Sequence, residues 1–213
     1  MMLRLQRYNQ TKQTLLIVLF LVSVEVFTSA QTTSSYEISK IAFKTNLLYD
    51  AALIPNLGVE VNLGKQWTIA ADGLWAWWSS NSNHRYWQGY GGYFSLRHYL
   101  GQRAKERIFT GHHLGVYGLA LTYDVEWGGR GYQSAHFGFG GGVEYGYSLP
   151  IGHHLNLDFS LGLGFQDGEY KEYDPEDGHY VWQSTHKRHW WGPTKAEISL
   201  VWLLGHSKKG GSQ

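Results

Sequence analysis

The sequence predicts an all-β fold, an eight-stranded antiparallel up-and-down transmembrane β-barrel of the outer-membrane type. Three observations predict it. The segment 155–165 (LNLDFSLGLGF) alternates large apolar with small or polar side chains, which is the period-two pattern of a strand with two unlike faces. Its length matches the roughly 9–11 residues that a tilted strand needs to cross a bilayer. Similar segments recur along the chain, and their connections alternate short and long, as in outer-membrane barrels.

The composition favours such a barrel over a soluble domain. Charged residues make up 16% of the chain, against about 25% in typical soluble domains, and Gly accounts for 27 of 213 residues. A net charge of +1 argues against a nucleic-acid-binding protein, which would need a basic stripe. The absence of Cys excludes disulfides, Cys-based zinc sites and a lipid anchor on Cys.

The first 30 residues have the pattern of a secretory signal peptide. Basic residues at the start precede the apolar run 15–24, and the segment ends in Thr28-Ser29-Ala30. The apolar run is too short for a membrane-spanning helix. We expect residues 1–30 to be the signal peptide, 31–39 a short leader, 40–205 the barrel domain and 206–213 a flexible tail.

The first half of the barrel domain contains four predicted strands. They are 41–50 (IAFKTNLLYD), 57–63 (LGVEVNL), 67–77 (WTIAADGLWAW) and the less regular 86–100. Gly64-Lys65 favours a tight hairpin between the second and third strands. A polar loop at 79–85 separates the third from the fourth.

The second half supplies four more strands, again by alternation. They are 108–123, 137–147, 155–165 and 191–204. Short turns are expected at 101–107 and 150–154, and longer loops at 127–131 and 166–189. The last of these is the longest predicted loop in the chain.

The apolar face of each strand is expected to point outward into lipid. An eight-stranded barrel is just wide enough for side chains to fill it, so several large residues from every strand would overfill the interior. The opposite face, rich in Gly, Ser, Asn and Asp, fits. A soluble lipocalin-like barrel, with its apolar face inward, is an alternative, but its exterior would be richer in Lys and Glu.

Charged side chains on the small face are predicted to form a structural network that closes the lumen. Buried charges need partners, because unpaired ones are costly. The residues are Lys44, Glu60, Asp72, Arg97, Glu144, Asp158, Lys195 and Glu197. A proton path, an ion pore or an active site would be the functional alternatives. Since barrels this narrow carry no open channel, we expect no porin activity.

Two groups of residues could support chemistry, and neither forms a recognisable motif. Glu126, Ser134 and His136 combine the acid, hydroxyl and imidazole of a hydrolytic set. A metal could be held by the second group, which is His179, His186, His189, Asp174, Glu176 and Asp177. A solvated loop is the favoured interpretation of that group. No catalytic, cofactor-binding or metal-binding residue is assigned, and no cofactor is expected.

Trp and Tyr residues gather near the predicted strand ends. Examples are Trp75, Trp77, Trp78, Tyr86, Trp87, Trp190 and Trp191. Such residues form the aromatic girdles of membrane barrels at the two interfaces. Carbohydrate binding by the Trp residues in the loops is an alternative interpretation.

Six stretches, taken together, carry a resemblance that covers nearly the whole chain after the signal peptide. They are KTNLLYDA (44–51), PNLGVE (55–60), FSLRHYLG (94–101), GHHLGVYG (111–118), VEYGYSLPI (143–151) and GPTKAEISLVW (192–202). With them the chain resembles a family of exported Bacteroidetes-type proteins known as a domain of unknown function. The resemblance implies an outer-membrane β-barrel, with some relatives in fimbrial gene neighbourhoods, and no established activity.

The expected function is structural or interactive: anchoring, adhesion or partner binding through extracellular loops in the cell outer membrane. The expected partners are outer-membrane lipid and surface or fimbrial proteins, not nucleic acid. An enzyme is less favoured. The alternative function is a lipid-modifying outer-membrane enzyme, similar to a lipid A deacylase or acyltransferase.

Overall fold

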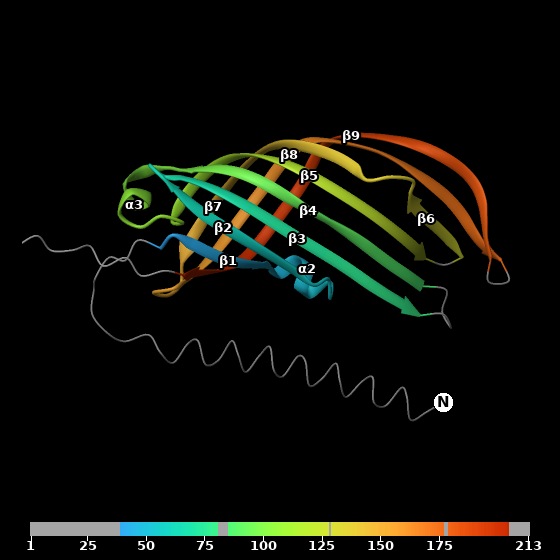
Figure 1. Cartoon of the computed structure of the whole chain (residues 1–213), viewed down its shortest axis with the longest axis horizontal. Helices are drawn as coiled ribbons and strands as arrows, with labels where there is room; N and C mark the ends of the chain where they lie inside the picture. Colours follow the sequence, from blue (N-terminus) through green and yellow to red (C-terminus); the bar gives the residue numbers. More distant parts are fainter. Residues whose placement is uncertain (1–38, 81–84, 128, 177–178, 205–213) are drawn as a thin grey trace, which may run out of the picture. The chain divides into compact units, whose positions relative to one another are not determined.

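The computed structural model describes residues 39–80, 85–127, 129–176 and 179–204. Within these ranges the chain is an antiparallel β-structure with two short helices (Figure 1). The strands are β1 (Ile41–Asn46), β2 (Asn56–Gly64), β3 (Trp67–Ser80), β4 (Arg85–Tyr99), β5 (Gly111–Trp127), β6 (Arg130–Ser134), β7 (Gly138–Pro150), β8 (Leu155–Glu176) and β9 (His179–Leu204). The helices are α2 (Leu47–Ala51) and α3 (Gly101–Glu106). The predicted all-β class is confirmed.

Eight of these strands close into a ring. Ile41 on β1 lies opposite Val61 on β2 and opposite Leu204 on β9, so the first and last strands pair. The ring continues from β2 through β3, β4, β5, β7 and β8 to β9, with every pair antiparallel. The predicted eight-stranded up-and-down order is therefore confirmed. β6, which was not predicted, lies between the far ends of β5 and β8.

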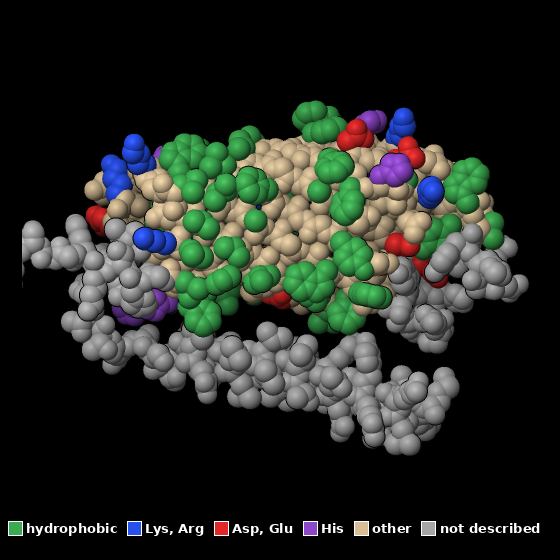
Figure 2. Space-filling view, viewed as in Figure 1, with side chains coloured by type: hydrophobic (Ala, Val, Ile, Leu, Met, Phe, Trp, Pro, Cys, Tyr) green, Lys and Arg blue, Asp and Glu red, His purple; other side chains and the backbone are tan. Residues whose placement is uncertain are grey.

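The two faces of the ring differ as the alternation predicts. Large apolar side chains such as Val143 and Leu161 point outward, with exposed fractions of 61% and 53%. Polar and charged side chains point inward, and Arg97 is fully buried. Figure 2 shows hydrophobic side chains over the middle of the visible face, with most charged side chains toward its two ends.

The predicted strand 41–50 is wrong over its last four residues. β1 ends at Asn46, and residues 47–51 form helix α2. The Asn46 side chain accepts a hydrogen bond from the Leu48 amide at 3.1 Å, and Asn is a strong helix N-cap. In the part of the chain described, no helix is long and apolar enough to cross a membrane.

The predicted long loop 166–189 is also wrong. β8 continues to Glu176, and β9 begins at His179, so most of this segment is an extended two-stranded arm. The segment 166–174 (QDGEYKEYD) is polar on both faces, so hydrophobic alternation gave no signal there. β1 stops at Asn46, and β2, which runs in the opposite direction, starts at Asn56. The other ring strands continue beyond this level, so the wall has two strands fewer there.

The chain folds inward at the end of the ring that holds α3. Residues 108–110 do not belong to the fifth ring strand as predicted; β5 begins at Gly111. Phe109, whose φ is 63°, is fully buried there. The residues around it form an apolar cluster made of Ala42, Tyr99, Ala104, Ile108, Phe109, Val201 and Leu203. This end of the interior is therefore filled with side chains.

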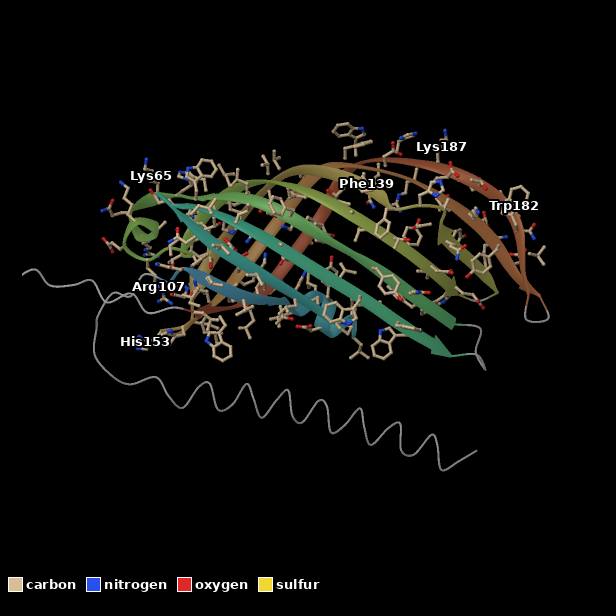
Figure 3. The ribbon with its side chains drawn as sticks, in the orientation of Figure 1. Lys65, Arg107, Phe139, His153, Trp182 and Lys187 are labelled. Atoms are coloured by element: carbon tan, nitrogen blue, oxygen red, sulfur yellow. The ribbon has the colours of Figure 1, made fainter. Side chains whose placement is uncertain are left out.

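Arg107 ties two turns together at the same end. Its guanidinium Nη2 donates to the Gly152 carbonyl at 2.9 Å and to Asn156 Oδ1 at 3.1 Å. Partial burial lowers the pKa of Arg107. Figure 3 places Arg107 and His153 at this end and Lys187 and Trp182 at the opposite one. We call the first the turn end and the second the outer end.

Candidate functional site

The middle of the ring interior holds a cluster of acidic and basic side chains, to which seven of the eight ring strands contribute. All eight residues of the sequence-predicted network are brought together there. They are Lys44 on β1, Glu60 on β2, Asp72 on β3, Arg97 on β4, Glu144 on β7, Asp158 on β8, and Lys195 and Glu197 on β9. We call this set the interior ion cluster.

Arg97 occupies the centre of the interior ion cluster. Its guanidinium contacts Glu144 at 2.6 Å, Glu60 at 3.0 Å and Glu197 at 3.0 Å. A fourth carboxylate, Asp158, lies 3.7 Å away. The planar guanidinium presents five N–H donors in fixed directions, which suits a site where carboxylates approach from four strands.

The two lysines link the remaining carboxylates. Lys195 Nζ donates to Glu144 at 2.7 Å and to the Ser95 hydroxyl at 2.9 Å. Lys44 Nζ lies 2.9 Å from Asp72 and 3.7 Å from Glu197. Three cations thus face five carboxylates, an excess of two negative charges among these eight residues.

Sequence reasoning missed the contribution of β5. His113 is fully buried, and its Nε2 lies 2.9 Å from Asp158. The neighbouring His112 points outward, where its ring contacts the Tyr145 hydroxyl at 2.7 Å. Strand alternation would have found His113, because it lies on the same face as the buried Tyr117.

Neutral hydroxyl groups donate further hydrogen bonds to the carboxylates of the cluster and were also missed by sequence reasoning. Glu60 accepts from Thr68 at 2.6 Å and from Tyr99 at 3.1 Å. Asp158 accepts from Ser160 at 2.9 Å. Buried charges are tolerated when their hydrogen bonds are made, and these hydroxyls supply three of them. Asp72 Oδ2 and His113 Nδ1, by contrast, are buried without a hydrogen-bond partner among the described residues.

Aromatic side chains lie next to the interior ion cluster on its outer side. Lys195 Nζ is 5.3 Å from the ring centroids of both Tyr93 and Tyr117. Tyr117 also hydrogen-bonds to Thr194, and Tyr93 to Tyr49 of α2 at 3.2 Å. The interior is thus layered, with an apolar cluster at the turn end, ions in the middle and aromatic rings above them.

A separate cavity of about 580 Å³ lies at the outer end. Its lining includes Tyr123 and Val125 of β5, Tyr132 of β6, Tyr170 of β8 and Arg188 of β9. The register puts these side chains on the face that continues the ring interior. We call this surface the outer trough.

The candidate hydrolytic set does not assemble. Glu126 lies opposite Gly131, three residues before Ser134 on β6, so the carboxylate and the hydroxyl point to opposite faces of the sheet. The Ser134 hydroxyl accepts from the Tyr123 amide at 3.1 Å. His136 Nδ1 contacts the Ala135 carbonyl instead of a serine.

The candidate metal ligands also separate. His186 and His189 are three residues apart on β9 and point to opposite faces. His186 lies 3.7 Å from Glu172, and His189 lies 3.2 Å from Asp167. Asp177 lies outside the described residues, as do the side chains of Glu176 and His179. Among the described residues no group of three or more His, Asp or Glu is arranged to hold a metal.

Comparison with protein families identifies a match. A family model described as "Protein of unknown function (DUF3575)" matches residues 15–204. The chain belongs to the DUF3575 family. The resemblance to a domain of unknown function is thereby confirmed. Neither the curated proteins nor the solved structures contain a match.

The DUF3575 match extends over the whole ring, the interior ion cluster and the outer trough. The family description names no activity, substrate or partner. The geometry of these two sites is therefore what indicates the function of this DUF3575 protein.

Proposed function

We propose that this protein is an outer-membrane β-barrel with a closed lumen, which presents its outer end to partners at the cell surface. Anchoring and adhesion are the roles that such an arrangement supports. Surface or fimbrial proteins, together with outer-membrane lipid, are the proposed partners.

The observation that carries the proposal is the uncharged outward face of the ring. The outward positions from 155 to 165 on β8, and from 196 to 204 on β9, contain no Asp, Glu, Lys or Arg. They contain exposed apolar residues such as Phe159, Leu163 and Trp202. A water-soluble protein rarely exposes a contiguous apolar patch larger than a few hundred Å², whereas a lipid-facing barrel surface requires one.

The buried residues of the interior support the same assignment. Fully buried Arg97, Glu144 and Asp158 occupy the place where a soluble barrel would hold its apolar core. In a membrane barrel the polar face is the inner one. The polar face of the strands therefore points inward and the apolar face outward, which is the reverse of a soluble barrel.

The layered interior supports a closed lumen. Arg97 and its carboxylates fill the middle, and the cluster around Phe109 fills the turn end. An eight-stranded barrel has room only for its side chains. We propose that the purified protein gives no steady ion conductance in planar bilayers; steady single-channel steps would contradict this.

The alternative function is a lipid-modifying enzyme, which would need a hydrolytic set. The candidate residues for such a set, Glu126, Ser134 and His136, do not converge, so they do not support this alternative. Mass spectrometry of lipid A from cells with and without the protein tests the alternative directly. An altered lipid A would require an enzymatic function.

Epitope tags test location and orientation together. One tag is inserted in the β8–β9 connection at the outer end, and the matched control is inserted in the Gly64–Lys65 hairpin at the turn end. In a diderm bacterium we expect antibody to reach the first tag on intact cells and the second only after permeabilisation. Recovery of both tagged proteins in the soluble fraction would refute the proposal.

A further inference from the structure

The outer trough has the size of a small-molecule site. Its cavity of about 580 Å³ falls within the roughly 300–1,000 Å³ of typical ligand pockets. Four strands, β5, β6, β8 and β9, supply its walls. A site built from strands holds its side chains more precisely than a site built from loops.

Aromatic rings line the outer trough. Tyr132 and Tyr170 come from neighbouring strands, and their ring centroids lie 6.1 Å apart. Tyr132 is 37% exposed, so its ring is available to a ligand. Tyr123 of β5 also lines the cavity. Trp190 lies beside the cavity, on the same face of β9 as the lining residue Arg188, and its indole Nε1 donates to the Pro193 carbonyl at 3.3 Å. These rings provide flat apolar surfaces that carry polar groups at their edges.

The cationic groups at the trough are not equivalent. Lys187 and Arg188 line the cavity, but as adjacent residues of β9 they point to opposite faces, and Arg130 lies beside the cavity on β6. Arg130 lies 3.1 Å from Glu172 and is paired. Arg188 lies over the Trp190 ring, 5.9 Å from its centroid. Among the residues that the structure describes, no carboxylate comes within ion-pair distance of Arg188. Its guanidinium is therefore free to bind an anion through two parallel hydrogen bonds.

The missing strands open the trough on one side. β3 pairs with β2 only as far as Leu74, and β9 pairs with β1 only as far as Ser199. Beyond these residues, no described strand covers the free edges of β3 and β9. A ligand can therefore enter from the side as well as from the end.

We propose that the outer trough binds an acidic saccharide, with its sugar rings stacked on Tyr132 and Tyr170 and its carboxylate or phosphate held by Arg188. The inference rests on the proposed function, since it names the ligand class of the outer end. The saccharide has two sources, a free oligosaccharide or the headgroup of a lipid in the outer leaflet. The open side of the trough admits either one.

The inference is tested by measuring binding to the purified full chain in detergent. Tryptophan fluorescence and calorimetry detect the binding. The probes are tri-galacturonate, its neutral methyl ester, and Kdo2-lipid A in mixed micelles. The variants are Arg188→Gln and Tyr132→Ala. The matched control is Lys65→Gln, which removes an exposed cation in the hairpin at the turn end (Figure 3). Before binding is measured, each variant is shown to be folded by its resistance to unfolding in detergent.

We expect tri-galacturonate or Kdo2-lipid A to bind, and Arg188→Gln to weaken that binding by about tenfold or more, as for the loss of a charge-assisted bidentate contact. Tyr132→Ala should weaken it by a similar factor, and Lys65→Gln should leave it unchanged. If only Kdo2-lipid A binds, the ligand is the headgroup of a lipid. If both anionic probes bind, the free saccharide is sufficient for binding.

Three results would overturn the inference: no binding of either anionic probe, equal binding of the methyl ester, or equal loss in the Arg188 and Lys65 variants. None of them would affect the tag experiment, which tests membrane location and orientation. The two proposals can therefore fail separately.

Discussion

Arg97 Nε donates to Glu144 Oε1 at 2.6 Å, although β5 separates their strands in the ring. This contact passes over β5 on the interior side, and the contact with Glu197 at 3.0 Å reaches β9 on the opposite side of the ring. Because Glu60 and Glu197 bind the same guanidinium, Arg97 connects β2, β4, β7 and β9 at a single point. The interior ion cluster is thus a cross-brace of the barrel.

Removal of this guanidinium should destabilise the barrel severely. Arg97→Gln leaves buried carboxylates without their main cation, and the loss of one partner of a buried ion pair costs about 3–5 kcal/mol. Unfolding by urea in lipid vesicles, followed by tryptophan fluorescence, measures it. Arg97→Lys keeps the charge but loses the fork of donors, so an intermediate loss is expected. An unfolding midpoint for Arg97→Gln equal to that of the unmodified protein would contradict the cross-brace.

Gly162 should not tolerate even a methyl group. An added Cβ would lie 2.6 Å from the Tyr117 ring and 2.8 Å from Lys195 Cβ, and both neighbours are held in the interior. Overpacking of this kind costs about 1–3 kcal/mol, so we expect Gly162→Ala to unfold at lower urea. Gly152→Ala is the matched control, because its Cβ would meet Leu155 at an ordinary 3.6 Å. Equal stability of the two variants would show that the interior has spare room.

Asn46 should matter more than other polar residues at strand ends. Its side chain accepts from the Leu48 amide at 3.1 Å and the Ile198 amide at 3.2 Å, and it donates to the Ala196 carbonyl at 3.2 Å. Loss of an N-cap costs about 0.5–2 kcal/mol, and we expect Asn46→Ala to lie at the upper end of that range.

Asn62→Ala is the matched control for this variant. Asn62 makes an exposed hydrogen bond to Gly64, so its loss should be smaller in the same urea titration. If the two substitutions cost the same, Asn46 does not anchor both α2 and β9.

Most of the ring could be predicted because its two faces differ in chemistry. In β8, the segment 155–165 has large apolar residues on one face and small or polar ones on the other, and alternation identifies such a strand directly. The interior ion cluster followed from the same pattern, since the charged residues of the small face must share one interior. The sequence pattern did not predict which charged residues pair with each other, because the contact of Arg97 with Glu144 joins strands that are not neighbours.

The outer end escaped prediction for the same physical reason. Beyond Phe165, both faces of β8 are polar, so alternation disappears although the strand continues. The outer trough depends on β6 and on the extended β9, neither of which the sequence revealed. The change from strand to helix at Asn46 depends on a side-chain cap within an apparently regular strand.

Leu161→Arg tests whether the apolar face meets lipid. Leu161 points outward in the middle of the uncharged surface and is 53% exposed. A cation near the bilayer midplane costs a membrane barrel about 2–4 kcal/mol, whereas an exposed surface substitution in water usually changes stability by within about 0.5 kcal/mol. The urea titration in vesicles therefore separates the two environments.

The matched control is Gln133→Arg, because Gln133 is also exposed but lies at the outer end, where it donates to Asp124 at 2.7 Å. Water surrounds that position under the proposed orientation, so the cation should have little effect there. A loss confined to Leu161→Arg supports lipid contact. A harmless Leu161→Arg would mean that the large side chains of the ring do not lie in a membrane, and the proposed location would fall with it.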